Sequence, residues 1–134
     1  MTNNTHYYYL HTNGSLIHKN AMVVESSPGY FDSPFVRKVW RIDTTNRMDA
    51  WILVIEAGAL GANKKRIEEL AKLWSLTDKD AHEFAKRAKL IIKKDGNAWM
   101  AAFQDFTNIQ ESQCGFGPTA LEAFIELAKQ GSIR

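Results

Sequence analysis

The chain has 134 residues, of which 45% are hydrophobic and 24% charged, and its formal net charge is +2. This length suits one compact domain, and so high an apolar content excludes an intrinsically disordered chain. No apolar run of roughly 18 residues is present to span a bilayer. The single cysteine excludes a disulfide framework or a cysteine-rich zinc site. The near-neutral charge argues against a protein built around general neutralisation of nucleic-acid phosphates.

The first predicted element is a β-hairpin. Asn13-Gly14 is a strong type I′ turn signal between the segments 6–12 and 15–19. A two-residue loop pairs His11 with Leu16 and Tyr9 with His18, which places Tyr8, Leu10 and Ile17 on one face. The other face then carries an aromatic, weakly polar set: Tyr7, Tyr9, His11, Leu16 and His18. Residues 21–24 are predicted to continue as strand, and 35–42 to form another one after the break at 26–29.

Three helices are predicted in the middle of the chain. Apolar residues recur at helical spacing from Met48 to Ala59, after the N-cap candidates 43–45 and before a stop at Gly61. Asn63 and Thr77 are the predicted N-caps of the second and third helices, each of which has its own apolar stripe.

The last third is predicted to return to strand. Segments 90–94 and 97–103 flank the hairpin signal Asp95-Gly96, and 106–112 is a candidate further strand. Residues 119–122, Thr-Ala-Leu-Glu, form a capping box that opens a final helix. We therefore expect one α+β domain over 1–134, β-rich at 5–42, helical at 44–89, β at 90–112 and helical at 119–130.

Helices 63–89 have the apolar positions of a helix-turn-helix, a unit that reads duplex DNA through its second helix. Three carboxylates near the start of that helix, Asp78, Asp80 and Glu83, would be repelled by phosphate. Two packed helices with a short connection are the simpler interpretation. Nucleic-acid binding stays an alternative, and it would rely on Lys64, Lys65, Arg66 and Lys79.

The sequence contains no constellation typical of catalysis. Cys114 has no general base near it in the sequence, and neither a nucleophile elbow nor a phosphate-binding loop is present. His11 and His18 lie diagonally across the predicted hairpin, but two histidines without a third ligand make an incomplete zinc set. We expect a protein that is not an enzyme and needs no cofactor or metal.

Several segments resemble a family of small, uncharacterised proteins encoded by phages and prophages. They are 35–40 (Phe-Val-Arg-Lys-Val-Trp), 43–45 (Asp-Thr-Thr), 74–77 (Trp-Ser-Leu-Thr), and 105–112 continuing through Gly115-Phe116-Gly117-x-Thr119-x-x-Glu122-Ala123. The similarity covers about residues 7–130. It implies a mobile-element gene that acts in a bacterial cytoplasm. The final strand, its Gly-x-Thr-x-x-Glu-Ala motif and the last helix also resemble the tail of HicB-type antitoxin domains.

The leading functional hypothesis is a non-enzymatic accessory protein that binds a host protein, such as an inhibitor of a bacterial defence system. Aromatic and arginine side chains are typical interface anchors, and the predicted ones are Tyr7, Tyr9, Arg37, Trp40 and Arg41. A second alternative is a binder of a small anion or nucleotide near Arg37, Arg41 or Arg66. The N-terminus has no secretory signal, so we expect the cytoplasm of the bacterial host and no membrane contact. Pairing of hairpin edges between subunits is left open.

Overall fold

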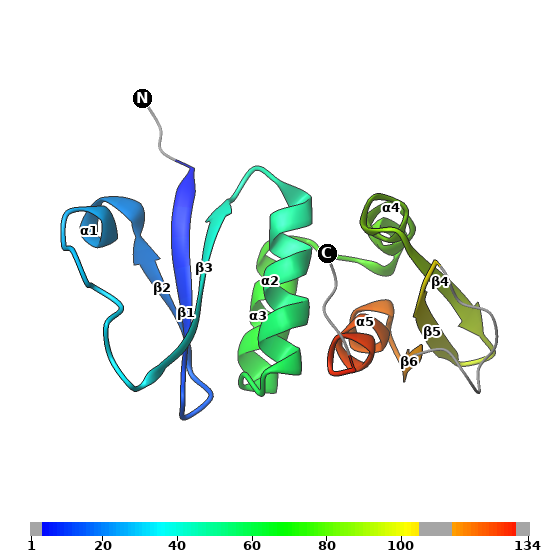
Figure 1. Ribbon diagram of the computed structural model, residues 1–134. Coiled ribbons are helices and arrows are strands. Elements are labelled where there is room, and N and C mark those ends of the chain that lie inside the picture. The colour runs from blue at the N-terminus through cyan, green and yellow to red at the C-terminus, as the bar shows by residue number, and fades with distance from the viewer. Residues whose placement is uncertain (1–3, 105–113, 131–134) are drawn as a thin grey trace.

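The computed structural model describes residues 4–104 and 114–130, and the predicted strand at 106–112 lies outside them. Two antiparallel three-stranded sheets enclose the larger helices, as Figure 1 shows. The α+β class expected from the sequence is confirmed. In chain order the elements are β1 (Thr5–His11), β2 (Leu16–Asn20), α1 (Ala21–Glu25), β3 (Val36–Asp43), α2 (Arg47–Ala59), α3 (Lys64–Leu73), α4 (Asp78–Ala88), β4 (Leu90–Asp95), β5 (Ala98–Phe103), β6 (Cys114–Gly117) and α5 (Ala120–Ala128).

The first sheet has the strand order β2-β1-β3, and its hairpin register differs by one residue from the predicted one. Leu10 pairs with Leu16 and Tyr8 with His18, because the loop contains three residues and not two. The Gly14 backbone has a φ of +93°, and its N–H donates to the His11 carbonyl. This geometry is typical of a three-residue loop that ends in a left-handed residue. Because side chains alternate along a strand, the shift moves Leu16 and His18 onto the Tyr8 face.

The segment after β2 is the short helix α1, so the predicted continuation as strand over 21–24 was wrong. The Asn20 side chain accepts a hydrogen bond from the Met22 N–H at 2.8 Å and caps this helix. Local capping chemistry therefore determined the structure here, although the β-branched residues favour a strand.

Helix α2 lies at the centre of the molecule, between two hydrophobic clusters. Its residues Leu53, Val54 and Ala57 pack with the first sheet and α3. Trp51 and Ile55 pack with α4, the second sheet and α5. The sequence of α2 fits this position because an apolar side chain is present on nearly all sides of the helix.

The second sheet has the order β4-β5-β6, and α4 and α5 cover one of its faces. Asp95 pairs with Ala98, so the two central turn residues are Gly96 and Asn97. The hairpin expected from Asp95-Gly96 is present, with its turn displaced by one residue. The capping box is confirmed on one side, because the Thr119 hydroxyl accepts a hydrogen bond from the Glu122 N–H at 3.1 Å.

Candidate functional site

Helix α1 and the connection 26–35 lie against the outer face of the first sheet, on the side away from α2, as seen at the left of Figure 1. The anchor of this cover is Phe31. Its ring centroid lies 5.9 Å from that of Tyr7 and 5.4 Å from that of Tyr9, both on β1. The two tyrosines predicted as exposed anchors are therefore half-buried beneath a segment of the same chain.

The cover itself exposes apolar side chains. Among the described residues six large hydrophobic side chains are exposed, and four of them belong to this cover. They are Met22 (73%), Val23 (49%), Tyr30 (36%) and Phe35 (59%). We call these four residues, together with Phe31, the N-terminal face. They are spread along the cover, from α1 beside the His6 end of β1 to Phe35 beside its His11 end. Several exposed apolar groups on one segment of a small protein are typical of an interaction surface, whereas single exposed apolar residues are ordinary.

Polar groups border the N-terminal face on one side. The Tyr7 hydroxyl donates to Glu25 Oε1 at 3.1 Å, and Arg41 Nε lies 3.7 Å from the same oxygen. Arg41 is the cross-strand partner of Tyr7, and its side chain is largely exposed. An apolar patch with an exposed arginine at its border resembles the composition of protein interfaces.

Two of the predicted anchors lie elsewhere. Trp40 is buried on the opposite face of β3, where its Nε1–H donates to Glu56 Oε1 at 2.9 Å. Arg37 donates to the Leu60 carbonyl beyond the end of α2. Trp40 alternates with Arg41 along the strand, so the two side chains cannot share one surface. The prediction of Trp40 as an exposed contact was wrong for this reason, and Arg37 also lies away from the N-terminal face.

The N-terminal face was not predicted from the sequence, because 21–24 and 35–42 read as strands and 26–29 as the break between them. One signal was present: apolar residues are interspersed with the Ser, Pro and Gly of 26–34, where a plain turn would be polar. A five-residue helix also gives too short a pattern for periodicity to detect.

His18 pairs with His6 and not with His11 as predicted. The His11 ring stacks on Phe35 at a centroid distance of 5.7 Å, whereas His18 meets His6. His6 Nδ1 and His18 Nε2 are 2.7 Å apart, so one ring donates to the other. Within 4–104 and 114–130 no group of three or more His, Cys, Asp or Glu residues could hold a metal.

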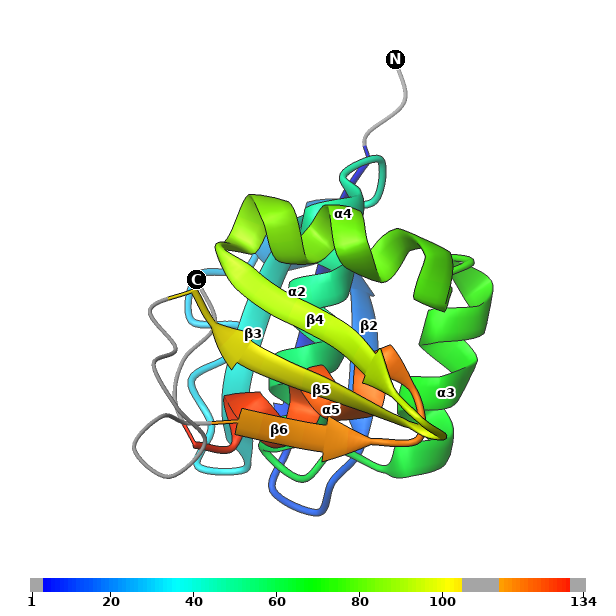
Figure 2. The same cartoon turned by 90° about the vertical axis from the view of Figure 1, so that its right-hand side faces the viewer.

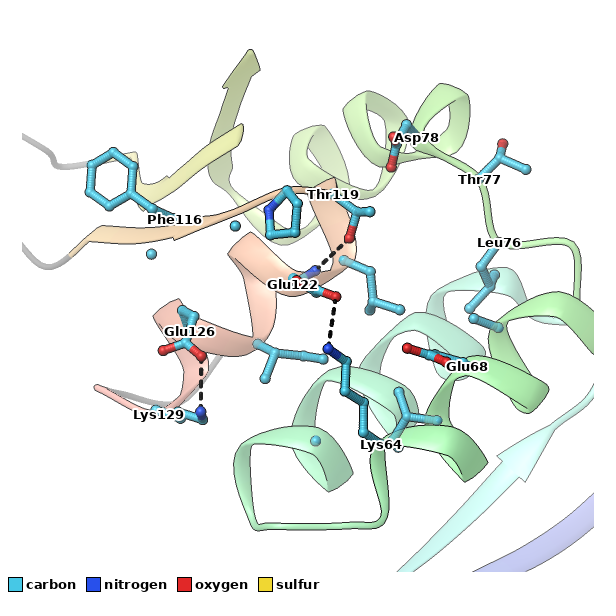
Figure 3. Close-up of a pocket in the computed structure, with 18 of the residues that line it drawn as sticks. Lys64, Glu68, Leu76, Thr77, Asp78, Phe116, Thr119, Glu122, Glu126 and Lys129 are labelled. Atoms are coloured by element: carbon cyan, nitrogen blue, oxygen red, sulfur yellow. Dashed lines mark hydrogen bonds and ion pairs between the residues drawn. The ribbon is translucent and has the colours of Figure 1, made fainter. Parts of the chain in front are cut away.

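A groove of about 980 Å³ lies between α3 and α5, both of which pack on α2 (Figure 3). Its apolar lining comes from both sides: Ile67, Ala71, Leu76, Leu121 and Ile125. Across the groove Lys64 Nζ lies 3.7 Å from Glu122 Oε1, and on the α5 side Lys129 Nζ lies 2.9 Å from Glu126 Oε1. The rim charges thus largely neutralise one another. The whole lining carries three lysines and four carboxylates, a near balance that selects no ligand by charge.

The basic residues of the nucleic-acid alternative are not gathered on one surface. Lys64 is paired across the groove, and Arg66 Nε donates to the Leu16 carbonyl at 3.1 Å. Lys65 is exposed on α3, and Lys79 is exposed on α4. The buried residues of α3 and α4 also belong to two different hydrophobic clusters. The pair therefore lacks the common apolar interface of a compact helix-turn-helix.

The arginines proposed for an anion do not converge either. Arg37 binds the Leu60 carbonyl, Arg41 lies beside Glu25, and Arg66 is 3.7 Å from Glu69 as well as bonded to Leu16. Each guanidinium thus has a partner within the chain. The three also come from separate places in the fold, so they form no common anion site.

No family model, curated protein or solved structure matches the chain. In the described part of the chain, no helix combines the length and the hydropathy needed to cross a bilayer.

Proposed function

We propose that the chain is a non-catalytic binding protein whose partner is another protein, docked on the N-terminal face. The observation that carries this proposal is the concentration of exposed apolar side chains in one cover segment, with four of six between Met22 and Phe35. Burying a Met or Phe side chain contributes about 1.5–3 kcal/mol, so a few such residues supply much of the affinity of a specific complex.

The partner recognised by this surface is apolar at its centre. Arg41 at the border favours an acidic group opposite it, because Glu25 satisfies the arginine only through a long and exposed ion pair. From the phage-family resemblance we propose that the partner is a host protein, such as a component of a bacterial defence system, and that binding inhibits it. The resemblance alone supports this context.

The first experiment compares two double variants in affinity capture from a nuclease-treated bacterial lysate. Met22→Ser/Phe35→Ser removes the two most exposed members of the N-terminal face. Leu73→Ser/Phe116→Ser is the matched control, since these side chains are 69% and 49% exposed and lie on α3 and β6. We expect the first variant to lose a protein that both the wild type and the control retain.

The captured protein is then purified and its binding is measured by calorimetry with the same three chains. The N-terminal-face variant should bind at least 100-fold more weakly than the wild type, which corresponds to about 2.7 kcal/mol. Two results would contradict the proposal. One is an equal loss of affinity in the control variant, and the other is a partner that is captured only when the nuclease is omitted.

A further inference from the structure

We infer that the exposed side of α4, together with the adjoining end of β4, binds the phosphate backbone of double-stranded nucleic acid without reading its sequence. This site is separate from the N-terminal face and does not depend on it. In Figure 2, α4 runs along the upper edge of the molecule, and β4 starts at the end of α4 and slopes away below it.

Four lysines form the site, with a histidine among them. Lys79, His82 and Lys86 recur at a spacing that keeps them on one side of α4, and Lys89 follows as the left-handed C-cap residue; all four are exposed. Lys94 adjoins them, because its ammonium lies 6.0 Å from the ring centroid of Trp99, whose other neighbour is His82 at 5.9 Å. We call Lys79, Lys86, Lys89 and Lys94 the α4 stripe.

The acidic residues of α4 do not oppose this site, although the sequence alone suggested that they would. Asp80 Oδ2 lies 2.5 Å from an Arg47 nitrogen, and Glu83 Oε1 accepts from Arg87 at 2.9 Å. Asp78 Oδ1 accepts from the Ala120 N–H, so this carboxylate faces α5. Asp78 and Asp80 are thus directed to partners within the fold, whereas Glu83 is 60% exposed on the side of Lys79 and Lys86, where Arg87 offsets its charge.

The lysines themselves have no such partners. No hydrogen bond or ion pair joins Lys79, Lys86 or Lys89 to another described side chain, and Lys94 contacts only the Trp99 ring. Asp95, the next acidic residue along β4, alternates with Lys94 and so belongs to the other face of the strand. On the exposed side of α4, Lys79, Lys86 and Arg87 outnumber Glu83, so the local charge is positive on a chain whose overall charge is only +2.

The chemistry of the stripe indicates which polyanion it fits. None of the exposed large apolar side chains of the described chain lies between Asp78 and Asp95, so the surface lacks the apolar anchors of a protein interface. Trp99 is only 9% exposed and offers no platform on which an unpaired base could stack. Lysines act as point charges on phosphate, and bidentate base recognition belongs to arginine. The α4 stripe therefore fits a double-stranded nucleic acid that is contacted through its phosphate backbone.

The test uses fluorescence anisotropy with a labelled duplex of about 20 base pairs and mixed sequence, titrated at several salt concentrations between about 50 and 200 mM. Four lysine–phosphate contacts predict that log K falls with log salt at a slope of about −3 to −4. A duplex RNA and a single strand of the same length distinguish a general backbone contact from one specific to DNA geometry or to unpaired bases.

Two triple variants of equal charge change identify the site. Lys79→Gln/Lys86→Gln/Lys94→Gln alters the α4 stripe and leaves Lys89 at the helix end. Lys64→Gln/Lys65→Gln/Lys72→Gln alters α3 by the same three charges. We expect the first variant to bind at least 10-fold more weakly at about 50 mM salt, with a slope near −1, and the second to bind within about three-fold of the wild type.

Three results would overturn the inference. The first is the absence of duplex binding by the wild type at about 50 mM salt, where phosphate contacts are strong. The second is an equal loss in the α3 variant, which would indicate a delocalised attraction or a site on α3. The third is tighter binding of the single strand than of the duplex. Thermal unfolding of both variants confirms that the substituted, exposed positions leave the fold intact.

Discussion

His6 and His18 are joined by a hydrogen bond across the first hairpin, with Nδ1 of His6 2.7 Å from Nε2 of His18. One nitrogen must donate and the other accept, so full protonation of both rings would remove the bond and place two cations in contact. The pKa of His18 is lowered, first by burial and then by His6, Arg66 and Lys19. The folded protein therefore binds fewer protons at this site than the unfolded chain.

The sign of the resulting pH dependence follows from linkage. Stability from the His18 site is fully present above the unfolded pKa of about 6.5 and is lost as the pH falls through the lower folded pKa. We expect the urea concentration at half-unfolding to decrease as the pH is lowered from 7.5 to about 5.5, a range above the pKa of most carboxylates. His18→Gln should reduce the change of the urea midpoint with pH. His82→Gln, which alters a histidine outside the pair, should leave the pH dependence as it is in the wild type. A wild-type midpoint constant over this range would contradict the prediction.

Trp40 connects the first sheet to α2, so we expect its side chain to contribute to the stability of the fold. Its ring is 6% exposed, its Nε1–H donates to Glu56, and the Lys38 ammonium lies 5.5 Å from the ring centroid. Trp40→Ala is expected to cost about 3–5 kcal/mol of unfolding free energy in urea titrations, because it leaves a cavity and removes the donor. Arg41→Ala, its neighbour on the exposed face, should change stability by less than about 0.5 kcal/mol. Equal effects would mean that the face assignment of β3 is wrong.

The helix caps differ in a measurable way. The Asn46 side chain accepts from the N–H groups of Met48 and Asp49, whereas Thr77 makes no hydrogen bond to the start of α4. Asn46→Ala should therefore cost about 1 kcal/mol in urea unfolding. Thr77→Ala should cost clearly less, since only its bond to the Asp80 carboxylate is lost. A larger cost for Thr77 would show that its hydroxyl does cap the helix in solution.

Helix periodicity and turn residues predicted most elements of the fold, α1 and β6 excepted, and competing local chemistry explains several of the errors. Asp43 was a cap candidate for α2, but its carboxylate accepts from the Thr45 hydroxyl and N–H, which also holds the pKa of Asp43 below its usual value. The first hairpin contains the Asn-Gly signal, yet the preceding Thr12 joins the loop. A turn signal locates a hairpin and leaves its register open by one residue, which is enough to exchange the faces of a strand.

Less of the candidate site could be predicted, because surfaces depend on contacts that are distant in sequence. The partners of the α4 carboxylates show this most clearly, since Asp80 finds Arg47 and Asp78 finds Ala120 only after folding. The same holds for Tyr7 and Tyr9, which Phe31 covers. Composition and periodicity specify which residues are apolar or charged, and the tertiary fold decides which of them remain accessible.

The close approach of β6 to α5 should make Gly115 the least tolerant glycine of the second sheet. A Cβ atom at this position would lie 2.2 Å from the Ala123 carbonyl oxygen and 2.3 Å from the Leu127 nitrogen. Both obstacles are backbone atoms of α5, so no side chain can rotate away and the strand or the helix must move. Gly115→Ala is expected to cost about 3 kcal/mol or more in urea unfolding.

Gly96 supplies the matched control for this substitution. It lies in the turn of the same sheet with a φ of +63°, and nothing is found within 4 Å of a Cβ placed there. Asparagine tolerates this left-handed conformation, so Gly96→Asn should cost less than about 1 kcal/mol. A Gly115→Ala protein as stable as the Gly96→Asn protein would mean that β6 and α5 are farther apart in solution than this packing requires.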